Sequence, residues 1–229
     1  MVEFLLIDMD DTILDFHKAE FVALGRTMEH FGVAATQENR ELYRVINHDH
    51  WHRLELGELT RDQVRLGRFQ VFFSRLGRQV DSAECARVFE KYLSTGHFYL
   101  PGAEEALQAL QGRYRMFLAS NGTSSVSRPR IASAGLEKYF ENIFISHELG
   151  ANKPSLEYFE KCFAAIPGFD PSRAMIVGDS LSSDIRGGNV AGIRTCWVNP
   201  GGKVCPPDIH VDLQIQSLSQ LPGALEGEN

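Results

Sequence analysis

The 229-residue sequence is poor in cysteine, in net positive charge and in long apolar runs. Its four cysteines are widely spaced and form no CxxC pair, which argues against a zinc knuckle and a thioredoxin-like redox site. We expect buried, reduced thiols. A disulfide between Cys196 and Cys205 is disfavoured because we predict a cytoplasmic location.

The charge balance limits the possible partners. With 23 basic and 30 acidic residues, the formal net charge is -7, which argues against general binding to a nucleic acid polymer or to an anionic membrane. No run approaches the length of a membrane span, and the N-terminus lacks a basic region followed by a long apolar stretch. We therefore expect a cytoplasmic protein that acts on a small molecule.

The segment from Phe4 to Thr12, FLLIDMDDT, runs from four apolar residues directly into carboxylates. It predicts a buried parallel strand that delivers Asp8 and Asp10 to its C-terminal edge, where open α/β sheets bind ligands. Alternate side chains of a strand share a face, so both carboxylates would lie near one substrate atom or metal ion. Taken alone, the motif fits equally well a strand that ends and caps the next helix.

After residue 14 the pattern becomes helical and then, from about Phe98, alternating. The helical stretch contains the segments 20–30, 38–56, 61–76 and 82–93. The later part predicts helices at 103–112, 125–134, 155–165 and 182–191, interleaved with strands at 115–120, 142–146, 174–178 and 194–198. Such alternation predicts a parallel sheet with helices on both faces.

The first strand belongs with the later sheet, because one isolated strand cannot satisfy its backbone groups or bury its side chains. The helical stretch is therefore an insertion. We predict an α/β core domain from residues 1–14 and 98–229 and an α-helical domain from residues 15–97, which would serve as a lid.

Polar residues also follow three of the later strands. Ser120 and Asn121 precede a helix, where a hydroxyl, an amide and a flexible backbone favour phosphate binding. Taken alone, a simple helix cap explains this segment better. Lys153, before Pro154, offers a point charge for a phosphate or a carboxylate cluster. Asp179 would complete a carboxylate site for Mg²⁺, whereas the helix dipole alone would account for Asp184.

Four successive strands end in polar motifs, and the combination is specific: Asp-x-Asp, Ser-Asn, Lys-Pro and Gly-Asp. In these motifs, carried by Asp8/Asp10/Thr12, Ser120, Lys153 and Asp179/Asp184, the chain resembles the haloacid dehalogenase-like (HAD) hydrolases over essentially its whole length. The resemblance implies an α/β fold, a Rossmann-like three-layer parallel sheet core with an inserted α-helical cap domain.

The resemblance also implies roles for individual residues. Asp8 would be the nucleophile and Asp10 the general acid and base. Mg²⁺ would be held by Asp8, Asp179 and the backbone carbonyl of Asp10. The remaining implied roles are phosphate binding by Ser120, Asn121 and Lys153, and support by Thr12 and Asp184.

Asp10 favours phosphate ester hydrolysis over dehalogenation, because dehalogenases of this superfamily lack an aspartate there and have no leaving alcohol to protonate. Two departures from the family pattern stand out. Asp11 occupies a place where many relatives have glycine, and Pro129 indicates that the helix after Ser120 starts late.

The insertion narrows the resemblance. The segments Val45 to His48 and Glu55 to Thr60 are similar to the cap of the YjjG and YfnB branch, which includes pyrimidine 5'-nucleotidases. Asn47 and Trp51 would then hydrogen-bond and stack on a base, although burial in the helical packing is the alternative for Trp51.

The leading hypothesis is thus a Mg²⁺-dependent phosphomonoesterase that forms an aspartyl-phosphate, acting on pyrimidine or non-standard nucleoside monophosphates. A phosphatase or mutase of sugar phosphates in the same superfamily is the first alternative. A signalling receiver, in which Asp8 is phosphorylated without turnover, is the alternative from another class.

Overall fold

The computed structural model describes residues 1–227. The chain divides into two compact units, one formed by Met1–Phe16 with His97–Asn229 and the other by His17–Gly96. We call them the core unit and the helical unit and describe each by itself. That the two fold as separate domains stays a prediction.

The core unit is built on a six-stranded sheet in the order β3-β2-β1-β4-β5-β6, with every neighbouring pair parallel. Its strands are β1 (Phe4–Ile7), β2 (Arg115–Ser120), β3 (Asn142–Ile145), β4 (Ala174–Gly178), β5 (Arg194–Val198) and β6 (Leu213–Ile215). The strand order reverses at β1, as in Rossmann-like folds, where ligands bind at the carboxyl edge beside the reversal.

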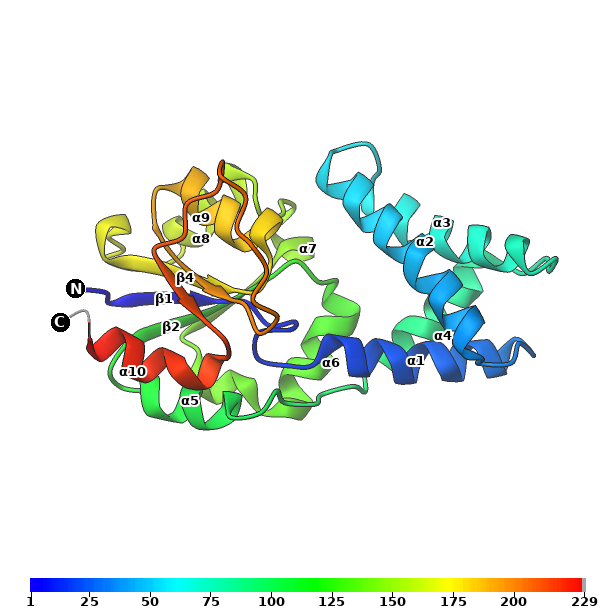
Figure 1. Cartoon of the computed structure of the whole chain (residues 1–229), viewed down its shortest axis with the longest axis horizontal. Helices are drawn as coiled ribbons and strands as arrows, with labels where there is room; N and C mark the ends of the chain where they lie inside the picture. The colour runs from blue at the N-terminus through cyan, green and yellow to red at the C-terminus, as the bar shows by residue number, and fades with distance from the viewer. Residues whose placement is uncertain (228–229) are drawn as a thin grey trace. The chain divides into compact units, whose positions relative to one another are not determined.

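Both faces of the sheet are buried, because alternate side chains of each strand enter different apolar clusters. In β1, Leu5 and Ile7 pack in one cluster, whereas Phe4 and Leu6 pack in the other. Helices α5 (Ala103–Leu110) and α10 (Leu221–Glu226) cover the first face. The second is covered by α8 (Leu156–Ala164) and α9 (Arg186–Ala191) (Figure 1). The predicted three-layer α/β fold is confirmed.

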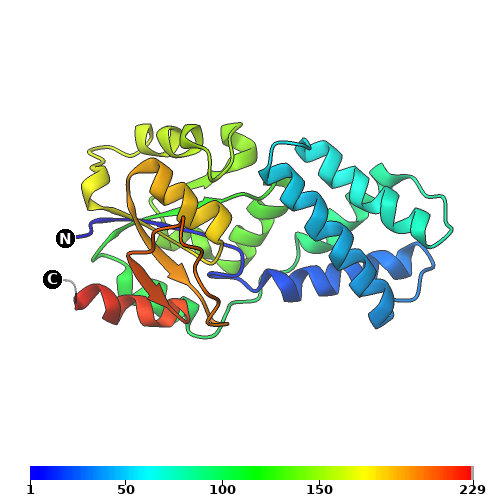
Figure 2. The ribbon, with the colours of Figure 1, turned by 45° about the horizontal axis from the view of Figure 1, so that its top comes forward.

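The helical unit follows β1 in the chain and contains these helices, shown in Figure 2: α1 (Phe16–His30), α2 (Gln37–Glu55), α3 (Arg61–Arg75) and α4 (Ser82–Leu93). Phe16, the first residue of α1, still belongs to the core unit. Their starts follow from local chemistry. Thr36 and Asp81 accept backbone N–H bonds at the starts of α2 and α4, and Thr60 forms a capping box with Gln63 at α3. An aromatic cluster that includes Tyr43 fills the interior.

Three details depart from the sequence predictions. The helix after Ser120, α6 (Ser124–Ala134), does not start late but carries Pro129 inside it. Its first turn closes before the proline, since Val126 and Ser127 donate to the Thr123 carbonyl. The helix expected at 182–191 begins as a π-helical turn, Leu181–Ile185, and β6 and α10 had not been predicted.

The four cysteines are free thiols, and three of them are buried. No disulfide therefore joins Cys196 to Cys205. Among residues 1–227, no helix combines the length and the apolar character that crossing a membrane requires.

Candidate active site

The predicted site residues of the core unit gather at the carboxyl edge of the sheet. Ile7, the last residue of β1, is paired with Leu118 of β2 and Val177 of β4. The residues that follow these strands therefore meet at one edge. Asp8, Ser120 and Asp179 all lie there.

Asp8 is a buried carboxylate held by a lysine. Its backbone N–H donates to the Val177 carbonyl, which extends the strand ladder by one residue. Its Oδ1 accepts a hydrogen bond from Lys153 Nζ at 2.6 Å. Burial raises the pKa of Asp8 well above its usual value; Lys153 opposes this rise and neighbouring carboxylates add to it. Additional positive charge is therefore needed to keep Asp8 ionised.

Lys153 uses all three of its ammonium protons. Nζ donates to Asp8 Oδ1 at 2.6 Å, to the Ala119 carbonyl at 2.6 Å and to Asp184 Oδ1 at 2.7 Å. Burial works against the charge, but the Asp184 and Asp8 carboxylates outweigh it and the pKa of Lys153 lies above its ordinary value. A charged Lys153 thus joins two carboxylates that follow different strands.

Asn121 fixes the segment that carries Lys153. Its amide nitrogen donates to the Lys153 carbonyl and its amide oxygen accepts from the Lys153 N–H, both at 2.9 Å. The peptide bond from Lys153 to Pro154 is cis. The side chain of Asn121 is therefore engaged with the backbone, which leaves a phosphate-binding role to its own main chain.

Asp184 reaches the cluster through the π-helical turn after β4. The Ser180 N–H donates to Asp184 Oδ2 at 3.1 Å. A Cβ on Gly178 would lie 2.2 Å from that same oxygen, so glycine is required for the close approach. Turns of this type are frequent at functional sites.

Asp8, Asp179 and Asp184 could hold a metal ion, since each offers a carboxylate oxygen and these atoms lie within 4.8 Å of one another. Burial, Asp184 and Asp11 raise the pKa of Asp179 to about 8, against the opposing effect of Lys153. Three ionised carboxylates with one ammonium leave a formal charge of -2. Oxygen donors with this excess charge suit a hard divalent cation.

Asp10 has a separate partner. Its Oδ1 accepts a hydrogen bond at 2.6 Å from Nη1 of Arg130, whose side chain is 1% exposed. The two aspartates of the first motif are thus bound to different cations, Asp8 to Lys153 and Asp10 to Arg130.

Ser120, Thr12 and Asp11 shape the loops around the carboxylates. Ser120 is buried, and its Oγ accepts the Gly122 N–H at 3.1 Å. Thr12 is fully buried, and within residues 1–227 its hydroxyl has no hydrogen-bond partner. Asp11 adopts a left-handed conformation with φ of 57° while its Oδ1 accepts the Phe16 N–H. This conformation explains why glycine suits the position.

Comparison with known proteins identifies the family. Residues 2–192 match the haloacid dehalogenase-like hydrolases. The chain belongs to this hydrolase family. The resemblance inferred from the four motifs is confirmed.

Similar proteins share nearly the full length of this hydrolase. It is 37% identical to the HAD-hydrolase YfnB of Bacillus subtilis, over 98% of this chain and 96% of YfnB. The crystal structure of YfnB bound to magnesium matches with a TM-score of 0.94 at 36% identity, covering 98% of both chains.

Two further relatives are named as pyrimidine 5'-nucleotidases. PynA of Streptococcus pneumoniae is 38% identical over 86% of this chain and 84% of its own length. YjjG of Escherichia coli is 31% identical over 96% of both chains. The similarity to the YjjG and YfnB branch is thus confirmed.

Asn47 and Trp51, the predicted base contacts, both lie on α2 of the helical unit. Asn47 is buried there, donating to Glu20 Oε1 and accepting from Arg68 Nη1, both at 2.8 Å. Trp51 is partly exposed. A base contact for either residue stays a prediction.

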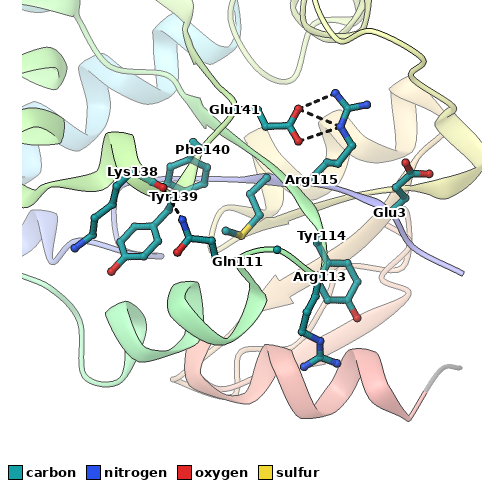
Figure 3. A pocket seen from close by; sticks show the side chains of 11 residues that line it. Glu3, Gln111, Arg113, Tyr114, Arg115, Lys138, Tyr139, Phe140 and Glu141 are labelled. Atoms are coloured by element: carbon teal, nitrogen blue, oxygen red, sulfur yellow. Dashed lines mark hydrogen bonds and ion pairs between the residues drawn. The ribbon is translucent and has the colours of Figure 1, made fainter.

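The opposite, amino-terminal edge of the sheet has a cavity of about 440 Å³. Figure 3 shows Arg115 and Glu141 facing each other in it, with Tyr114 and Tyr139 also lining its wall. Arg115, Lys138 and Arg113 already pair with Glu141, Glu104 and Glu226. These cations pair with exposed acids, whereas the carboxylates at the other edge are largely buried and could hold a metal ion. The carboxylate cluster is therefore the stronger candidate for an active site.

Sequence reasoning missed Arg130 and the role of Gly178. Arg130 lies on the buried side of α6 with Val126 and Ile131. A charged residue on an apolar helix face, just after a candidate phosphate loop, was the signal that could have indicated it.

Proposed function

We propose that this hydrolase is a Mg²⁺-dependent phosphomonoesterase that forms an aspartyl-phosphate at Asp8 and acts on pyrimidine or non-standard nucleoside 5'-monophosphates. The observation that carries the proposal is the cluster of Asp8, Asp179 and Asp184, in which Asp8 and Asp184 both accept a hydrogen bond from Lys153. The three carboxylates suit a divalent cation. One of them, Asp8, is the first aspartate of the Asp-x-Asp motif, which supplies the nucleophile in this family.

Asp8 and Asp10 divide the chemistry. An Asp8 oxygen attacks phosphorus, the bond from phosphorus to the ester oxygen breaks, and the leaving oxygen takes a proton from Asp10. Asp10 then accepts a proton from water as the water oxygen bonds to phosphorus, which releases phosphate and regenerates the Asp8 carboxylate. Covalent catalysis thereby splits one difficult displacement into two easier ones.

The donor set fits Mg²⁺. Asp8, Asp179 and the backbone carbonyl of Asp10 would hold it, with Asp184 beside them. When bound, the ion supplies positive charge that neutralises the phosphoryl oxygens and keeps the carboxylates ionised. The crystal structure of the relative YfnB contains magnesium, which supports this assignment.

The phosphoryl group would lie between Ser120, the main chain at Asn121 and Lys153. Ser120 lies at the strand edge that carries Asp8, and Lys153 donates to Asp8 at 2.6 Å. To bind a phosphoryl oxygen, Lys153 would turn one of its three ammonium protons away from its present acceptors. Fixed donors of this kind stabilise the charge that develops on the transferring group.

The nucleotide assignment is supported by the relatives PynA and YjjG, both named as pyrimidine 5'-nucleotidases. Family names establish less about substrate than about mechanism, because specificity depends on a few side chains around a shared site. The substrate is therefore the part of the proposal that an experiment should test first.

The test measures phosphate release from a panel of pyrimidine, purine and base-modified nucleoside monophosphates and sugar phosphates. Each substrate is assayed with Mg²⁺ and with EDTA, beside Asp8→Asn. We expect metal-dependent release, highest with pyrimidine monophosphates and absent in Asp8→Asn. Greater phosphate release from sugar phosphates would make a sugar phosphate the assigned substrate and leave the mechanism unchanged. A stable phospho-Asp8 without phosphate release would favour a signalling receiver.

A further inference from the structure

Arg130 is an arginine buried in the core unit, with a side chain only 1% exposed. It lies on the side of α6 that carries Val126 and Ile131 inward. An arginine at an apolar position must have a charged or polar partner, because burying an isolated charge is costly. Its Nη1 donates to Asp10 Oδ1 at 2.6 Å, which provides that partner.

The guanidinium is also held from a second direction. Its carbon atom lies 5.6 Å from the centre of the Phe16 ring, within cation–π range. Phe16 is itself tied to the first motif, because its N–H donates to Asp11 Oδ1 at 3.0 Å. Arg130, Asp10, Asp11 and Phe16 therefore form one connected arrangement that fixes where the Asp10 carboxyl group points.

This arrangement is distinct from the contacts of Asp8. Lys153 bonds Asp8 and Asp184, whereas Arg130 bonds Asp10, and the two cations come from different segments of the chain. Each carboxylate of the Asp-x-Asp motif thus has its own cation. The separation matches the need for one group that attacks phosphorus and another that moves protons.

We propose that Arg130 is a positioning residue that orients Asp10 for proton transfer to the leaving oxygen. The inference rests on the proposed function. A guanidinium only donates, so its bond occupies Oδ1 of Asp10 as an acceptor and leaves Oδ2 to carry the transferred proton. Arg130 keeps its own protons and charge throughout. The guanidinium is held by the Phe16 ring as well as by Asp10, and the flexible point charge of a lysine would reproduce this placement less well.

The test exploits the leaving group. A nucleoside 5'-oxygen needs a proton as it leaves, whereas the nitrophenolate of p-nitrophenyl phosphate leaves without one. If Arg130 positions Asp10, Arg130→Met should lower kcat for a nucleotide by about 100-fold, the lower end of what general acid catalysis contributes. The kcat for p-nitrophenyl phosphate should fall far less, and KM should change little for both substrates.

The matched control is Arg128→Met on the same helix, which removes a surface pair with Glu148. We expect this variant to retain wild-type kcat on both substrates. In an Asp10→Asn background, Arg130→Met should cause little further loss, because both changes would disable the same step. Arg130→Lys keeps a charge and should give a smaller effect in the same direction, and it provides the comparison if Arg130→Met does not fold.

Equal losses on nucleotide and p-nitrophenyl phosphate would show that Arg130 supports only the structure and would overturn the inference. Additive losses with Asp10→Asn would overturn it as well. The proposed function is judged separately, by wild-type turnover and its disappearance in Asp8→Asn. A hydrolase that passes this check while Arg130→Met shows equal losses would keep its function and lose only the role of Arg130.

Discussion

The two edges of the core sheet carry ion pairs of the same length in different surroundings. At the carboxyl edge, Lys153 and Asp184 pair at 2.7 Å with both side chains 1% exposed. At the amino-terminal edge, Arg115 and Glu141 also pair at 2.7 Å, but their side chains are 29% and 47% exposed. Solvent screens the second pair, whereas the first has lost its hydration.

The difference indicates which edge is built for chemistry. An exposed pair contributes about 0–1 kcal/mol, and the amino-terminal edge has several such pairs. Desolvating a charge costs several kcal/mol, so three carboxylates around one lysine are a poor means of stabilising a fold. Their proposed roles in attack, cation binding and phosphoryl binding would account for this cost.

The largest expected effect separates the two edges by activity. Asp8→Asn removes the proposed nucleophile and should lower kcat by about 10⁴-fold or more, as loss of a nucleophile does in other enzymes. Glu141→Gln, at the other edge, should leave kcat within twofold, about the spread expected of a surface change. Phosphate release under saturating Mg²⁺ measures both. Substantial turnover by a clean preparation of Asp8→Asn would contradict the assignment of catalysis to the carboxyl edge.

A stability measurement sharpens the same contrast. Lys153→Met leaves Asp8 and Asp184 without their shared cation and should lower the free energy of unfolding by about 3–5 kcal/mol. Arg115→Met should lower it by about 1 kcal/mol or less. Urea unfolding of the metal-free protein provides both values. Comparable losses would mean that burial does not distinguish the two pairs.

Replacing a glycine by alanine should also cost more stability at the carboxyl edge than at the amino-terminal edge. Gly178→Ala would bring a Cβ within 2.2 Å of Asp184 Oδ2, so the carboxylate must move. We expect a loss of about 1–3 kcal/mol, typical of overpacking, together with weaker Mg²⁺ activation. Gly112→Ala meets no atom within 4 Å and should cost only the strain of its φ of 78°. Unchanged Mg²⁺ activation in Gly178→Ala would contradict this account of the turn.

The smallest effect should be a gradual dependence on pH. The pKa of Asp179 is raised to about 8, so above pH 4 the folded, metal-free protein keeps a proton that the unfolded chain has lost. Stability should therefore fall as pH rises toward 8. Saturating Mg²⁺ should flatten this slope, because the cation stabilises the ionised carboxylate. Thermal melting from pH 5 to 8, with and without Mg²⁺, tests the sign, and a rise in the metal-free protein would contradict it.

The strand ends were predictable because their geometry is local and shared. An apolar run that stops at a polar residue predicts both the strand and the edge, and parallel strands bring those edges together. Asp8, Ser120 and Asp179 were placed in this way. The helices α2 to α4 were predicted nearly to the residue because glycines mark the helix ends: Gly57 and Gly77 follow the C-caps of α2 and α3 directly.

What the sequence could not provide depends on contacts between distant segments. The Arg130 to Asp10 bond spans 120 positions. The helix face could have indicated that Arg130 is buried, but nothing local to either residue indicates that they are partners. The engagement of Asn121 with the Lys153 backbone is of the same kind. The late start expected from Pro129 was wrong because the first turn of α6 closes before the proline is reached.

The measurement that tests the central claim most directly is the detection of phosphate on Asp8 during turnover. The hydrolase is mixed with a nucleoside monophosphate and Mg²⁺, quenched in acid within the first turnovers and analysed by peptide mass spectrometry. We predict one added phosphoryl group on the peptide containing Asp8, lost when excess substrate is exhausted. Steady phosphate release with that peptide never modified, or modification at another residue, would contradict the account.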